Sequence, residues 1–296
     1  TQPTKDQGLN IAFANNQIQL NRLLSEISYY RHNGLISQLD TDMGDTLQRT
    51  GSYYTLLHFL NSAVDDQGRP LKSAYQEDIN QLTTSDGIYR RSNDPGYWGF
   101  DSENCSRDQL IAAQTAIVTF KDFKRGRSLF VQFLKRGLLN QNTRNNWSYP
   151  WQNSYSWKFP DLPTPSQLSL LLRGLGSWTV YPAVFVLDFF ILADVKYFRS
   201  QNERQLWDYD IKLLPILIAS NSYMSTPWSL LGMRLYIQQR SDITRRIYYY
   251  NQSKFNGILP LAGIYALALD KIQHRDSSAL PKTYIQANDR SPSNFK

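Results

Sequence analysis

Apolar residues recur at intervals of three and four along most of the chain, which is the spacing of helices with one buried face. Alternating runs bounded by tight turns, the signature of β-strands, are nearly absent. The pattern therefore predicts an all-α protein. The expected helices cover residues 18–30, 46–64, 107–119, 129–138, 167–175, 183–198, 211–220, 230–239 and 259–272.

The chain contains no linker of distinct composition, so residues 1–275 are expected to form one domain, followed by a polar tail over residues 276–296. So many helices in one domain suggest an irregular bundle or an (α/α) toroid, in which inner and outer helices alternate around a cleft. We expect the toroid-like arrangement. No repeat of fixed period is visible, which disfavours a solenoid. Long polar loops, at 86–104 and 140–166 above all, are expected to carry function.

Two of the expected helices begin with the same kind of polar cluster. Asp45 precedes Gln48 by three residues, and Ser106 precedes Gln109 by the same interval. Both pairs fit a capping box, in which the two side chains satisfy free backbone N–H groups at the helix start. Helix capping alone is therefore one complete explanation of these four residues.

Capping does not require the other residues around these starts. Asp45, Arg49 and Tyr53 follow one another at four-residue intervals and share one helix face. A face with these residue types is either solvated or lines a polar cleft. The second start is surrounded by similar residues, namely Trp98, Asp101, Glu103, Arg107 and Gln109.

The separation of the two starts suggests that they meet in space. Asp45 and Asp108 are 63 residues apart, which is enough for a helix, a return segment and two loops. Because inner helices of a toroid run parallel, both starts would open on the same end of the cleft. The layout resembles the (α/α)-toroid carbohydrate-active enzymes, both glycoside hydrolases and polysaccharide lyases, which place acidic residues at such ends among Trp and Tyr side chains.

This resemblance implies a catalytic pair of carboxyl groups. Glycoside hydrolysis needs one acid to protonate the leaving oxygen and one carboxylate as base or nucleophile. Asp45 and Asp108 are the preferred pair. A helix N-terminus favours an ionised carboxylate, which suits the base and opposes the acid. Asp101 or Glu103 would raise the pKa of one member as a like-charged neighbour, or Asp101 is itself the acid.

An aromatic loop supports a sugar-binding cleft. Six aromatic residues fall within residues 147–159, in a segment broken by prolines. Flat rings with polar edges stack well against the C–H faces of sugars. The alternative is that the rings only anchor the loop to the core. The predicted substrate-binding residues in this region are Trp147, Trp151, Trp157 and Asp161, in addition to Arg49, Tyr53, Trp98, Glu103, Arg107 and Gln109.

Charge and composition extend this picture. The net charge of +7 favours an acidic partner such as an anionic polysaccharide, and 19 Tyr and 7 Trp suit contact with sugars. The basic residues are scattered, so no nucleic-acid partner is expected. The single Cys105 excludes an internal disulfide, and the three histidines lack zinc-type spacing, so neither a metal nor a cofactor is expected. The start of the sequence lacks a signal-peptide pattern, but a trimmed exported chain would look the same, and we expect a secreted or periplasmic protein.

The most apolar stretch covers residues 177–198. Pro182, Asp188 and Asp194 interrupt it, so a helix buried on all sides is expected rather than a membrane span, and no membrane partner is expected. At least one of the two aspartates should be hydrogen-bonded inside the fold. His58 falls on the apolar side of its helix, where a core histidine is expected.

Two alternatives to hydrolysis stay open. A lyase would cut an acidic glycan by β-elimination, with Tyr53 or Tyr54 as base and Arg49 or Arg107 to stabilise the carboxylate. A non-catalytic helical protein would bind a glycan through the aromatic loop, and Asp45 and Asp108 would then only cap helices. The sequence does not fix the oligomeric state.

Overall fold

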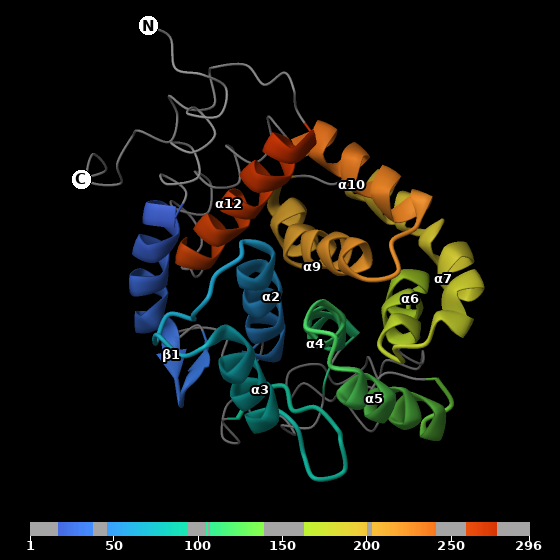
Figure 1. Ribbon diagram of the computed structural model, residues 1–296, viewed down its shortest axis with the longest axis horizontal. Coiled ribbons are helices and arrows are strands. Elements are labelled where there is room, and N and C mark those ends of the chain that lie inside the picture. Colours follow the sequence, from blue (N-terminus) through green and yellow to red (C-terminus); the bar gives the residue numbers. More distant parts are fainter. Residues whose placement is uncertain are drawn as a thin grey trace, which may run out of the picture.

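The computed structural model describes residues 17–37, 46–93, 105, 107–138, 163–199, 203–240 and 259–276, and most of these residues are helical (Figure 1). The predicted mostly helical class is confirmed. The first described helix covers residues 17–27. The further elements are η1 (Ser28–Tyr30), β1 (Arg31–His32), β2 (Leu35–Ile36), α2 (Thr46–Phe59), α3 (Leu71–Gln81), α4 (Arg107–Thr119), α5 (Phe123–Lys135), α6 (Pro165–Arg173), η4 (Trp178–Val180), α7 (Tyr181–Asp188), α8 (Ile191–Arg199), α9 (Glu203–Ser222), α10 (Pro227–Arg240) and α12 (Leu259–Asp276).

The described residues include one short antiparallel hairpin, in which Arg31 pairs with Ile36 and His32 with Leu35. Asn33 and Gly34 form its two-residue turn, and both have positive φ, at 49° and 83°. Asn-Gly is the preferred pair for such a turn because these residues adopt left-handed backbone at little cost.

Helix α3 was not expected from the sequence. Its buried residues Leu71, Ala74, Tyr75 and Ile79 do follow helical spacing, but Asp78 is fully buried on the same face. The aspartate and the surrounding Gln, Glu and Asn residues weaken the apolar stripe that identifies an amphipathic helix. The pattern hides the helix because its buried face is partly ionic.

Helix α5 begins six residues earlier than expected, because Asp122 caps it by accepting a hydrogen bond from the Arg125 N–H at 3.3 Å. Its first turn contains Gly126, where an added Cβ would lie 2.1 Å from the Gly174 carbonyl oxygen. Glycine at both positions lets α5 and the end of α6 approach backbone to backbone.

The prediction of a helix buried on all sides over residues 183–198 is wrong in two respects. The chain turns at residues 189–190, so that α7 and α8 are separate helices. Large apolar side chains of this region also face solvent, with Trp178 and Val186 each 61% exposed. By length and composition alone, the segment Trp178–Val195 would suffice to cross a membrane, and only 22% of it is buried inside the protein.

The larger core cluster joins apolar side chains from Leu20 near one end of the described chain to Ile272 near the other. Helix α4 packs against α2, α9, α6 and α5. In Figure 1, α2, α4 and α9 lie inside, and α3, α5, α7 and α10 lie around them. The polar residues at the starts of α2 and α4 are therefore attached to the most enclosed helices of the fold.

Candidate functional site

Helices α2 and α4 run parallel, side by side. An added Cβ on Gly51 would lie 2.4 Å from the carbonyl oxygen of Ala112, so the two backbones nearly touch at this point. One turn later the hydroxyl oxygens of Thr55 and Thr115 are 3.2 Å apart. At the far end the rings of His58 and Phe120 are 4.9 Å apart. In each pair the second residue is about 61 positions later in the sequence than its partner in α2. Because this difference stays nearly constant, the two helices run in the same direction and begin at the same end.

Helix α6 begins at this end too. Its first turn meets α8 through Ser166, whose hydroxyl donates to the carboxylate of Asp194, and the Arg107 charge at the start of α4 acts on the same carboxylate. At the opposite end of α6, Gly174 contacts Gly126, shortly after α4 has ended. Both ends of α6 therefore coincide with the matching ends of α4.

Helix α12 shares the direction of α2. The ammonium of Lys271, near the end of α12, donates to the carbonyl oxygen of Phe59 at the end of α2. One and a half turns earlier, Tyr265 is hydrogen-bonded to Ser52 of α2. Four of the described helices thus begin together, and we call the region around the first turns of α2, α4, α6 and α12 the shared end.

Each of the first three starts carries a glutamine in its first turn. Gln109 and Gln167 are fully buried, and Gln48 is nearly so. In α6 the cap is Thr164, whose hydroxyl oxygen accepts from the Gln167 N–H at 3.2 Å. A loop closes over the start of α2, because the Leu47 N–H donates to the Arg91 carbonyl oxygen at 3.1 Å.

Asp194 is a carboxyl group of the shared end that sequence reasoning did not select for chemistry. It is half-buried, and this burial raises its pKa above the ordinary value, against the opposing effects of the Ser166 hydrogen bond and the Arg107 charge. Such a group keeps its proton to higher pH than an exposed aspartate does. The only sequence signal was an aspartate within an apolar stretch.

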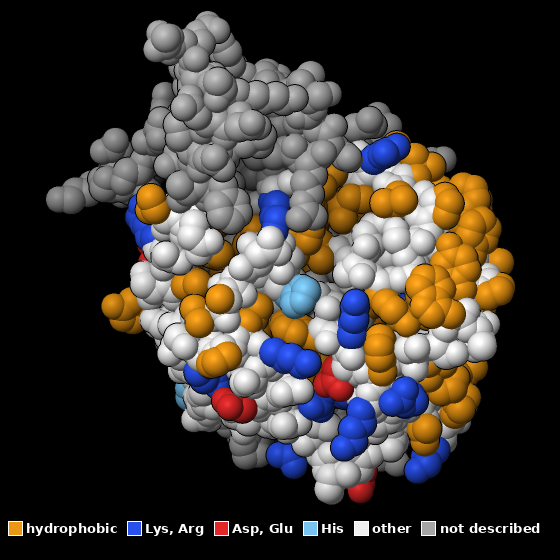
Figure 2. Space-filling view, in the orientation of Figure 1, with side chains coloured by type: hydrophobic (Ala, Val, Ile, Leu, Met, Phe, Trp, Pro, Cys, Tyr) orange, Lys and Arg blue, Asp and Glu red, His pale blue; other side chains and the backbone are white. Residues whose placement is uncertain are grey.

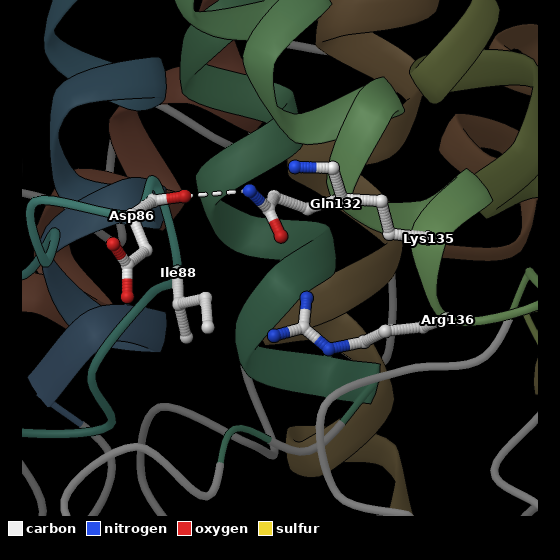
Figure 3. Close-up of a pocket in the computed structure, with 5 residues that line it drawn as sticks. All are labelled: Asp86, Ile88, Gln132, Lys135 and Arg136. Carbon is white, nitrogen blue, oxygen red and sulfur yellow. Dashed lines mark hydrogen bonds between the residues drawn. The ribbon is translucent and has the colours of Figure 1, made fainter.

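A recess lies at the shared end between α5 and the turn at residues 83–89 (Figure 3). The Gln132 side-chain amide donates to the Asp86 carbonyl oxygen at 2.6 Å and joins the two walls. The turn is held near the start of α4, since the Cys105 thiol donates to the carbonyl oxygen of Tyr89. The recess has a volume of about 310 Å³ and is lined by Asp86, Ile88, Gln132, Lys135 and Arg136.

Several predicted site residues lie outside the described residues: Asp45, Trp98, Asp101, Glu103, Trp147, Trp151, Trp157 and Asp161. The backbone of Asp108 is in the first turn of α4, but its side chain is outside the description as well. Arg49 and Arg107 are half-buried, in the first turns of α2 and α4. Gln109 is fully buried, so it supports the helix start from within.

Tyr53 belongs to an ionic cluster inside the protein rather than to an open surface. Its hydroxyl donates to the Asp66 carboxylate at 2.7 Å, and the Tyr54 hydroxyl donates to Asp78 at 2.5 Å. Arg31, whose side chain is 5% exposed, joins the two carboxylates at 2.7 and 2.9 Å. Burial and the neighbouring carboxylates raise the pKa of both tyrosines. The cluster fixes the 65–70 loop and α3 onto α2.

The expectation of a core histidine at position 58 is wrong, because His58 is exposed at the end of α2. Its ring lies against Phe120, and partial desolvation and the charges of Lys121 and Lys271 lower its pKa. This group lies at the opposite end from the shared end. In the described part of the chain, no three His, Cys, Asp or Glu side chains are arranged to hold a metal ion.

Comparison of the chain with protein-family models, with curated proteins and with solved structures finds no match in any of the three.

Proposed function

We propose that the protein is a carbohydrate-active enzyme that hydrolyses a glycosidic bond of a polysaccharide at the shared end of its helices. The observation that carries the proposal is the parallel packing of α2 and α4 through Gly51, Thr55 and Thr115. The sequence has an acidic residue directly before α2, at position 45, and one in the first turn of α4, at position 108, and the proposal is that they meet at this end. Paired carboxyl groups are what glycoside hydrolysis requires.

A toroid-like architecture is part of the proposal. Helices α2, α4, α6 and α12 share one direction, whereas α5 returns from the end of α4 toward its start. Alternating directions of this kind are what inner and outer helices of an (α/α) toroid have. The cleft of such a domain would open at the shared end and would be lined by the aromatic loop at 147–159, with the chain acting on a glycan outside the cell.

The roles of the carboxyl groups follow from their surroundings. A carboxylate at a helix start is held ionised by the helix dipole, which suits Asp45 or Asp108 as base or nucleophile. The acid must keep its proton, and burial raises the pKa of Asp194 in the required direction. We assign Asp194 as a candidate acid beside Asp101. Activity should then fall as pH rises through the raised pKa of the acid.

The recess at the shared end supports an acidic glycan. Lys135 and Arg136 contribute two cations to its wall, against the single carboxylate of Asp86. A uronate carboxylate or a sulfate group would be stabilised there by charge. The net charge of +7 also favours binding of an acidic glycan.

Elimination is the second candidate, and the buried tyrosines weigh against the form of it that uses Tyr53 or Tyr54. A base must reach the C5 proton of the sugar, but both side chains are fully buried and both hydroxyls are bonded to carboxylates. A lyase reaction would therefore need a different base. A purely glycan-binding protein stays as the third possibility.

The test replaces Asp45, Asp108 and Asp194 singly by Asn and measures new reducing ends on xylan, mannan, alginate and polygalacturonate. We expect losses of about 10²- to 10⁴-fold, because each change removes a proton-transfer group or nucleophile. Glu26→Gln, at a partly exposed side chain on the helix over residues 17–27, serves as the control and should keep full activity.

The outcomes separate the candidates. Full activity in all three variants would remove the proposal. Cleavage accompanied by the ultraviolet absorbance of an unsaturated sugar would establish elimination instead. Glycan binding without cleavage, weakened by Trp151→Ala and unaffected by Asp108→Asn, would establish a binding protein.

A further inference from the structure

Exposed apolar side chains are concentrated on η4, α7, the 189–190 turn and the outer side of α10. We call this surface the apolar flank. Figure 2 shows hydrophobic atoms gathered along the edge of the molecule where Figure 1 places α7 and α10. More than a third of each side chain is exposed, and the residues are Trp178, Phe185, Val186, Phe189, Phe190, Leu230 and Leu231.

Ring contacts join the aromatic members of the apolar flank. The Trp228 ring of α10 lies 5.8 Å from the Phe185 ring and 5.3 Å from the Phe189 ring, measured between centroids. At the N-terminal end of α7, the ring centroids of Trp178 in η4 and Tyr181 are 5.5 Å apart, so η4 extends the surface at that end. Large contiguous apolar patches on a soluble protein mark an interaction site, because exposing them to water is unfavourable.

The flank is anchored to the protein body along its length. Asp188 is fully buried and forms an ion pair with Arg173 of α6 at 2.5 Å. Asp194 accepts a hydrogen bond from Ser166 of the same helix. The segment Trp178–Val195 is long enough in total to cross a membrane, but the turn at residues 189–190 divides it, and both halves are bonded to α6 through Asp188 and Asp194. The geometry suits a surface that lies on a bilayer and does not cross it.

The charged residues around the flank indicate an anionic partner. Over residues 121–138, 163–195 and 211–240, the carboxylates in the sequence are Asp122, Asp188 and Asp194. Asp122 is paired with Arg125, Asp188 is fully buried against Arg173, and Asp194 is half-buried against Ser166. Exposed cations border the flank near η4. The Lys121 ammonium lies over the Tyr223 ring, and that ring contacts Trp178. The Arg127 guanidinium donates to the Leu175 carbonyl oxygen, three residues before Trp178. Arg234 is exposed one turn beyond Leu230.

We propose that the apolar flank binds the surface of a membrane that contains anionic lipids. Aromatic side chains insert favourably at the level of the lipid headgroups, and bordering Lys and Arg side chains add attraction to anionic lipid. A second copy of the chain fits less well. Two such flanks would bring cations together and would offer no exposed carboxylate from the ranges above to pair with them.

The test measures sedimentation of the full chain with phosphatidylcholine vesicles, with and without phosphatidylglycerol. We expect binding that is strongest with phosphatidylglycerol and that weakens with salt. Phe189→Ser with Phe190→Ser should weaken binding about ten-fold, because two inserting rings are lost. Arg127→Glu with Arg234→Glu should remove the preference for phosphatidylglycerol. Tyr29→Ser is the control, at an aromatic position outside the flank that is more exposed, at 79%, than Phe189 or Phe190, and it should bind as the unchanged protein does.

The proposal is overturned if the unchanged protein does not sediment with phosphatidylglycerol vesicles, or if Tyr29→Ser weakens binding as much as the double Phe variant. It is also overturned if the unchanged protein self-associates in solution without binding vesicles and the double Phe variant is monomeric, because the flank would then join two copies of the chain. All substituted positions are exposed, so circular dichroism spectra should match that of the unchanged protein.

Discussion

Asp188 and Asp194 are six residues apart in one apolar stretch, and their surroundings give them different roles. Asp188 is fully buried and bonded to Arg173, Ser169 and Thr226, so its charge is compensated. Asp194 is half-buried and accepts a hydrogen bond from the Ser166 hydroxyl. Desolvation is the largest influence on its pKa and raises it. The sequence predicted that an aspartate in this stretch would be hydrogen-bonded, which Asp188 confirms. It could not identify the partners, because they come from other helices.

The Arg173–Asp188 pair should be one of the most sensitive points of the fold. Asp188→Asn leaves the guanidinium of a fully buried arginine without its counter-charge, which costs about 3–5 kcal/mol. Urea unfolding followed by tryptophan fluorescence would measure the loss. Replacing both residues by apolar ones, Arg173→Met with Asp188→Leu, should recover part of it, since no unpaired charge then stays buried.

The matched control is the exposed Arg22–Glu26 pair, with side chains 53% and 44% exposed. Glu26→Gln should change the unfolding free energy by less than about 0.5 kcal/mol. Equal losses in Asp188→Asn and Glu26→Gln would mean that the buried pair is hydrated and contributes little.

At the scale of elements, periodicity identified helices whose buried face is apolar and missed the one whose buried face is ionic. The expected bounds of α4 agree with the structure, because most of its buried residues, Ile111, Ala112 and Ala116 among them, are apolar. Helix α3 buries Asp78 toward Arg31, a partner 47 residues away. No local pattern reports such a partner. The break between α7 and α8 was missed because apolar residues run through it.

Contacts between elements depend on small residues that a periodicity argument does not weigh. Gly51→Ala would gain up to ~1 kcal/mol in helix propensity. The new methyl group would, however, lie 2.4 Å from the Ala112 carbonyl oxygen, and a backbone atom cannot move aside without separating α2 from α4. We expect a net loss of about 1–3 kcal/mol in unfolding free energy, measured by urea titration.

Gly232→Ala is the matched variant, because its methyl group would lie 3.1 Å from a side-chain carbon of Ile191, which has to give way by only a few tenths of an ångström. Its unfolding free energy should stay within about 1 kcal/mol of the unchanged protein. A Gly51→Ala protein that is more stable than the unchanged one would show that α2 and α4 are less closely packed than described.

For the whole molecule, the sequence predicted the relation on which the proposed site depends. Two polar helix starts 63 residues apart were expected to share an end, and the parallel packing of α2 and α4 agrees with this for their backbones. The third start, at α6, and the role of Asp194 were not predicted. Both depend on α8 folding back against α6 through Ser166, which is a tertiary contact without a sequence signature.

The position of Asp45 relative to Asp108 is open to direct measurement. With Cys105, which is buried, replaced by Ala, spin labels at Cys substitutions of Asp45 and Asp108 would report the distance by electron paramagnetic resonance. Parallel neighbouring helices have axes about 8–10 Å apart, so the distance between the labels should be short. Labels at His58 and Asp108 are the control, and at 1.5 Å per residue along α2 their backbones should be about 20 Å apart. If the first distance equals or exceeds the second, the two carboxyl positions do not share an end. A paired-carboxylate mechanism at Asp45 and Asp108 would then be excluded, whatever activity the protein has.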